Sequence, residues 1–262
     1  MAERLDTVVL ALSAAGMAAF AWLAAGRDSA GRALRTPQEP IGEGPHWVLF
    51  AGLGGFYLAV LIQNFAAADR PASAVDVSLW TRVAVSAAMA AVIVAAASSG
   101  VSRLAELGLP AEGRGRDVMV GVLAGLAALP PTYLLIAAAG DLGGDHPLVT
   151  RLRESGTASD WLAVVLSAVV LAPLAEETAF RGVIQNGLAR RLRPEAAIVL
   201  TATLFACVHP PETIVSLVPF AVGVGYVYHQ TQSLIASGAM HATFNGSMLL
   251  ALALETPPAA AP

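Results

Sequence analysis

The sequence contains no lysine, and charged residues of all kinds make up 13% of its 262 positions. A water-soluble domain carries about 25% charged residues, so this composition disfavours a soluble enzyme. The basic residues are all arginine and the net charge is −4, which leaves no basic face for nucleic acid. A single cysteine, Cys207, excludes an internal disulfide framework and a metal site built from several cysteines.

Hydrophobic residues make up 56% of the chain and the mean hydropathy is +0.66. Aromatic residues contribute only 6%, so most of the apolar side chains are small or aliphatic, which suits close helix packing in lipid. We therefore expect an all-α integral membrane protein that crosses the bilayer several times. The alanine- and arginine-rich composition is typical of GC-rich bacteria and favours the bacterial inner (cytoplasmic) membrane.

A helix needs about 20 mostly apolar residues to cross a bilayer. The sequence predicts about eight transmembrane helices in one bundle, or seven if one of the last two segments is tilted or re-entrant. The expected spans are Leu5–Gly26, His46–Ala68, Val83–Val101, Val118–Gly140, Trp161 to about Leu188, Glu195–His209, Ile214–Tyr228 and Leu234–Leu254.

The chain divides into a four-helix scaffold at 1–159, a catalytic part at 160–255 and a disordered tail at 256–262. The first span is too long for a signal peptide, so we expect it to be retained. With eight spans, the arginine-rich loops lie in the cytoplasm and both termini lie outside.

Ionisable residues inside apolar spans are costly and usually functional, and nearly all of them fall in the last third. Glu177 and Arg181 are four residues apart on a helix and can form an ion pair. Glu176 lies about 100° around that helix, so it is left to face another partner. The alternative is a helix end that emerges into a polar loop.

His209 ends the sixth expected span. Arg190–Pro194 is expected to form the turn before that span, with Glu176 17 residues before Arg193 and His209 16 residues after it. Equal distance from the turn of an antiparallel hairpin gives equal depth, here about 24–26 Å along each helix. Glu176 and His209 are therefore predicted to meet, although an interfacial histidine is the alternative.

His241 and Asn245 are four residues apart in the last expected span and project from one helix face, which Ser237 extends. The alternative is a simple interhelical hydrogen-bond pair.

A carboxylate, two imidazoles and a carboxamide can together hydrolyse a carbonyl substrate, since the carboxylate can deprotonate water and N–H groups can stabilise an oxyanion. Zinc held by Glu176, His209 and His241 is the other possibility.

These three segments resemble, in order and type, the motifs of the CPBP family, the group of CAAX proteases and bacteriocin-processing proteins also called Abi. The motifs are EExxxR, FxxxH and HxxxN, and here they comprise Glu176, Glu177, Arg181, Phe205, His209, His241 and Asn245. The resemblance covers roughly Asp160 to Leu250.

The resemblance implies an eight-helix intramembrane endopeptidase acting on a membrane-associated peptide or protein. In that family's pattern, Glu176 and His209 activate water, His241 and Asn245 form the oxyanion site, and Glu177 and Arg181 organise the first motif. A mechanism without a metal or other cofactor is favoured over the zinc alternative. A non-catalytic immunity or partner-binding protein and a proton-coupled transporter are the competing interpretations, and the sequence sets no oligomeric state.

Overall fold

A computed structural model describes the C-terminal half of the chain and short stretches before it. The described residues are Trp80, Val83, Ala84, Ala87, Ala91, Gly108, Leu109, 114–139, Leu152, Arg153, 157–209 and 213–255. Within these residues the structure contains helices and no strands, which agrees with the predicted all-α class. The expected spans Leu5–Gly26 and His46–Ala68, most of Val83–Val101 and the tail at 256–262 lie outside them, so the eight-helix count and the domain division stay predictions.

Two of the described helices are long and apolar enough to cross a membrane, judged by length and composition. One is Arg114–Leu135, within α4 (Arg114–Ala139). The other is the continuous helical stretch Ala158–Ala189, which corresponds to the predicted fifth span. A capping box begins this stretch, because the Thr157 hydroxyl accepts from the Asp160 N–H and the Asp160 carboxylate accepts from the Thr157 N–H.

The stretch Ala158–Ala189 changes its hydrogen-bond register several times. It consists of α6 (Ala158–Val164), the π-helix η2 (Val165–Leu171), α7 (Ala172–Glu177), the π-helix η3 (Thr178–Gln185) and α8 (Asn186–Ala189). The sequence pattern predicts one helix here but not the π-helical turns. Such turns are rare and often occur at functional sites.

Three further helices complete the described core, and their boundaries lie close to the predicted spans. They are α9 (Pro194–Cys207), α10 (Ile214–Thr231) and α11 (Leu234–Glu255). The predicted turn before the sixth span is confirmed, since Arg190–Arg193 joins α8 to α9. Outward-facing apolar side chains such as Leu134, Val170 and Val199 are more than half exposed, as is typical of a surface that contacts lipid.

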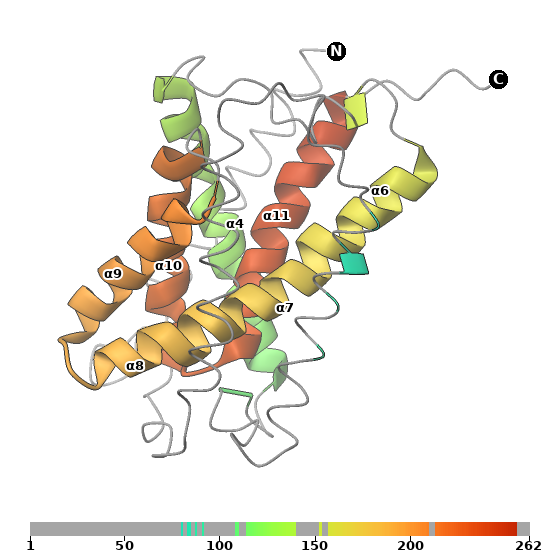
Figure 1. The fold of residues 1–262 in the computed structure, drawn as a ribbon. Coiled ribbons are helices and arrows are strands. Elements are labelled where there is room, and N and C mark those ends of the chain that lie inside the picture. Colours follow the sequence, from blue (N-terminus) through green and yellow to red (C-terminus); the bar gives the residue numbers. More distant parts are fainter. Residues whose placement is uncertain are drawn as a thin grey trace.

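Helix α11 packs closely against α4, and α6–α8 runs diagonally across α11 from the other side (Figure 1). The close approach depends on Gly121 and Gly125 of α4. A Cβ atom at Gly125 would lie 2.7 Å from the Met240 carbonyl oxygen and 2.8 Å from the Thr243 Cβ. This Gly-xxx-Gly spacing brings two helix backbones together in lipid and fixes α11 next to the polar residues of α7.

Candidate active site

Glu177 and Arg181 form a buried ion pair, as the four-residue spacing predicts. Arg181 Nη1 donates to Glu177 Oε1 at 3.0 Å, and both side chains are at most 1% exposed. Arg181 Nη2 also donates to the Ala221 carbonyl oxygen of α10 at 3.1 Å. The guanidinium therefore links the first motif to α10 while it compensates the Glu177 charge, as a buried carboxylate requires.

His241 lies between the two glutamates. Its Nδ1 is 2.8 Å from Glu177 Oε1, and its Nε2 is 3.8 Å from Glu176 Oε2. An ionised carboxylate only accepts hydrogen bonds, so Nδ1 carries a proton that it donates to Glu177. The Nε2 atom faces Glu176, which is 19% exposed and thus more accessible than Glu177. The two adjacent glutamates consequently have different surroundings.

Phe205 forms the aromatic centre of the cluster. Its ring centroid lies 4.5 Å from that of His209 and 5.8 Å from that of His241, and the Arg181 guanidinium carbon lies 4.8 Å from it. Phe220 also packs against His241, with its ring centroid at 5.2 Å. These rings hold the two imidazoles and the cation in a nonpolar environment, where electrostatic interactions are stronger than in water.

His209 lies just after α9, and its Nδ1 is 2.7 Å from the Phe205 carbonyl oxygen. A carbonyl only accepts, so Nδ1 carries a proton, and in the neutral ring Nε2 then presents a lone pair. His209 makes no direct hydrogen bond or ion pair with Glu176, although both are described. Their predicted meeting across the hairpin, through a shared water molecule or substrate, stays a prediction.

Asn245 projects from α11 toward η2. Its Nδ2 donates to the Ala168 carbonyl oxygen at 2.8 Å, while His241, one turn earlier, reaches Glu177 of α7. Both side chains therefore point toward the stretch Ala158–Ala189, as the spacing of the third motif predicts. Ser237, which extends this stripe, is fully buried.

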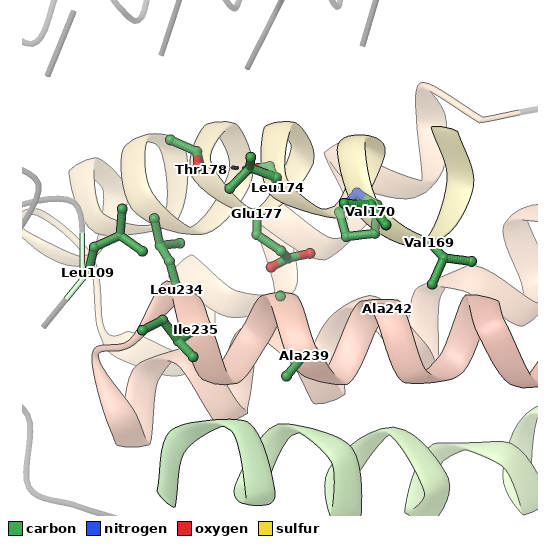
Figure 2. Close-up of a pocket in the computed structure, with 12 residues that line it drawn as sticks. Leu109, Val169, Val170, Leu174, Glu177, Thr178, Leu234, Ile235, Ala239 and Ala242 are labelled. Carbon is green, nitrogen blue, oxygen red and sulfur yellow. Dashed lines mark hydrogen bonds between the residues drawn. The ribbon is translucent and has the colours of Figure 1, made fainter. Parts of the chain in front are cut away.

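An apolar pocket of about 340 Å³ lies between the helical stretch Ala158–Ala189 and α11, as Figure 2 shows. The Glu177 side chain projects from α7 toward α11 into this region. The lining residues are Leu109, Val169, Val170, Pro173, Leu174, Glu177, Thr178, Leu234, Ile235, Gly238, Ala239 and Ala242. Glu177 is their only charged member, so the pocket suits a nonpolar group whose polar end approaches the glutamates.

The zinc alternative requires Glu176, His209 and His241 to converge on one point. Within the described part of the chain, no group of three or more His, Cys, Asp or Glu side chains is arranged to hold a metal ion. Glu176 and His241 approach each other, and the His209 contact with the Phe205 carbonyl oxygen uses Nδ1 and leaves Nε2 for another partner. The zinc alternative stays a prediction, and we derive no step through a metal.

Two polar residues that the sequence analysis did not single out attach η3 and α8 to α10. Gln185 Nε2 donates to the Gly225 carbonyl oxygen and Asn186 Nδ2 donates to the Tyr228 hydroxyl, both at 2.8 Å. Gln185 is one helical turn after Arg181, which donates to Ala221 one turn before Gly225. Arg181 and Gln185 are thus polar residues four positions apart on one helix face. This spacing is the sequence signal from which the contact of Gln185 with α10 could have been predicted.

A scan against protein-family models matches residues 158–247 to a family described as "Rce1-like: Type II CAAX prenyl endopeptidase Rce1-like". The matched segment covers about a third of the chain and contains all three motifs. No curated protein and no solved structure gives a significant match. The family match and the apolar helices together indicate a peptidase that is an integral membrane protein.

Proposed function

Residues 158–247 belong to the CAAX-protease (CPBP) family, and we propose that this protein is an intramembrane endopeptidase that uses Glu176 as its general base. The observation that carries this proposal is the different surroundings of the two glutamates. Glu177 is buried against Arg181 and His241, whereas Glu176 is partly accessible and has only a long contact with His241. A general base must reach water and substrate, which favours Glu176.

In the proposed reaction, Glu176 takes a proton from a water molecule, and the water oxygen attacks the carbonyl carbon of the scissile peptide bond. His209 assists by accepting a hydrogen bond from the same water through its Nε2 lone pair, consistent with the Nδ1 contact to Phe205. The tetrahedral intermediate then collapses, the C–N bond breaks, and protonated Glu176 returns the proton to the leaving amine.

His241 and Asn245 are proposed to stabilise the oxyanion of that intermediate. Because Nδ1 of His241 is committed to Glu177, Nε2 can donate to an oxyanion only when the ring carries a proton on both nitrogens. Asn245 uses one N–H of its Nδ2 for Ala168, and the second N–H is available to the oxyanion.

The proposed substrate is a membrane-associated peptide or protein with a nonpolar or lipid-modified segment next to the scissile bond. The apolar pocket beside Glu177 supports this class, since it offers a single charged lining residue and a volume of about 340 Å³. Pockets of 300 to about 1,000 Å³ are typical of small-ligand sites, so one lipid chain or a few apolar side chains would occupy this one.

The proposal is tested by peptide release from purified protein in lipid vesicles. The probe is a set of quenched fluorogenic peptides that includes one CAAX-type peptide with and without a farnesyl group. We expect wild type to release product and His209→Ala to lose release, while His229→Ala, a matched change in the last turn of α10, retains it. Equal release by wild type and His209→Ala would overturn the proposed role of His209, and no release by wild type from any of the peptides would favour the non-catalytic alternative.

A chelator added to the same assay tests the zinc alternative. Release that persists with chelator, in protein without zinc by elemental analysis, is the expected result. Loss of release on chelation, restored by added zinc, would replace Glu176-based chemistry with metal-based chemistry.

A further inference from the structure

Pro173 removes a backbone donor at one defined point of the helical stretch Ala158–Ala189. In η2 the N–H groups bond to carbonyl oxygens five residues earlier, as the bond from the Ala172 N–H to the Ser167 oxygen shows. The next bond in this register would join residue 173 to the Ala168 oxygen. Proline has no N–H, so the backbone cannot form this bond.

The carbonyl oxygen that loses its donor is the one that Asn245 contacts. Asn245 Nδ2 donates to the Ala168 oxygen at 2.8 Å, from a helix that is 77 residues away in sequence. A carbonyl group out of reach of water needs a hydrogen-bond partner. The Asn245 carboxamide supplies the N–H donor that the backbone of Pro173 lacks. The contact also fixes the orientation of the carboxamide, because the Nδ2 end must point toward η2.

We propose that Pro173 is a positioning residue for Asn245. Because residue 173 has no N–H, the Ala168 carbonyl oxygen is left to accept from Asn245, and this contact orients the carboxamide with Nδ2 toward η2. Pro173 is itself buried and lies one helical turn before Glu177. The same proline therefore couples the first motif to the third. The orientation claim stands on the contacts alone, and its catalytic consequence rests on the proposed function.

The substitution that tests the orientation claim is Pro173→Ala, which restores an N–H able to bond to Ala168. The matched control is Pro131→Ala, at an exposed proline inside α4. The sequence contains three asparagines, Asn64, Asn186 and Asn245, so protein labelled with ¹⁵N-asparagine gives few side-chain amide signals. Asn245→Ala identifies the pair that belongs to Asn245.

We expect Pro173→Ala to shift the Asn245 amide signals and to speed their exchange with solvent, and Pro131→Ala to leave both unchanged. Asn245 signals identical to those of wild type in Pro173→Ala would overturn the proposal. This readout needs no substrate, so it remains valid even if the protein releases no peptide.

Thermal unfolding gives a second, independent measurement. In the Asn245→Ala variant, the Ala168 carbonyl oxygen has lost the Asn245 donor, and Pro173→Ala supplies a backbone N–H in its place. Pro173→Ala should therefore raise the unfolding midpoint more in the Asn245→Ala variant than in wild type. Equal shifts in both backgrounds would contradict the coupling. If the protein is active, Pro173→Ala should lower kcat with little change in KM, and should add little to the loss caused by Asn245→Ala.

Discussion

His241 is hydrogen-bonded through Nδ1 to Glu177, at 2.8 Å, and not to the neighbouring Glu176, whose Oε2 lies 3.8 Å from Nε2. This relationship gives the paired glutamates separate tasks. Glu177, with Arg181, holds the imidazole in one orientation from a fully buried position. Glu176 faces the other ring nitrogen and remains accessible.

Replacing Glu177 should cost stability. Glu177→Gln leaves the buried Arg181 guanidinium beside a neutral amide, and removing one partner of a buried ion pair costs about 3–5 kcal/mol. The measurement is the unfolding midpoint in matched detergent or lipid. Glu195→Gln, at an exposed carboxylate in the first turn of α9, is the control and should unfold like wild type. Equal midpoints for the two variants would contradict the structural role of Glu177.

Arg181→Lys should not preserve the cluster. Arg181 donates through two different nitrogens, to Glu177 and to the Ala221 carbonyl oxygen, and a lysine ammonium is a single point charge that cannot reproduce this fork. Losing a hydrogen bond to a charged group costs about 1.5–3 kcal/mol. Arg191→Lys, in the exposed turn before α9, should have no effect on unfolding. If Arg181→Lys unfolds at the wild-type midpoint, one of the two contacts of Arg181 is enough to stabilise the cluster.

The close approach of α4 and α11 should be sensitive to one methyl group. Gly125→Ala places a Cβ 2.7 Å from the Met240 carbonyl oxygen, and such overpacking costs about 1–3 kcal/mol. Because Met240 precedes His241, the displacement should also lower peptide release. Gly115→Ala has open space around its Cβ and should be neutral or slightly stabilising. A Gly125→Ala variant with normal unfolding and release would show that α11 adapts to the methyl group.

The features that follow from local sequence were predictable. The Glu177–Arg181 pair depends only on a four-residue spacing, and the apolar runs gave the boundaries of α4, α10 and α11 to within a few residues. The shared direction of His241 and Asn245 also follows from helical periodicity.

The features that depend on tertiary contacts were not predictable. His241 and Glu177 are 64 residues apart in sequence, and no spacing rule indicates which glutamate an imidazole selects. The π-helical register of η2 involves an unpaired carbonyl that Asn245 satisfies from another helix, so the apolar pattern of residues 165–171 alone gives no sign of it. The direct partner of His209 is likewise the carbonyl oxygen of Phe205 in the preceding helix, which equal depth in a helical hairpin does not indicate.

We propose that Glu176 is the carboxylate that activates water. The most direct test is the single-turnover rate of peptide release by Glu176→Gln, normalised to folded protein and compared with Glu195→Gln. General-base catalysis contributes about 10²–10⁴-fold, so the rate for Glu176→Gln should fall by at least about 10²-fold at unchanged unfolding midpoint, while Glu195→Gln keeps the wild-type rate. A Glu176→Gln variant that releases peptide at the wild-type rate would show that Glu176 is not the general base.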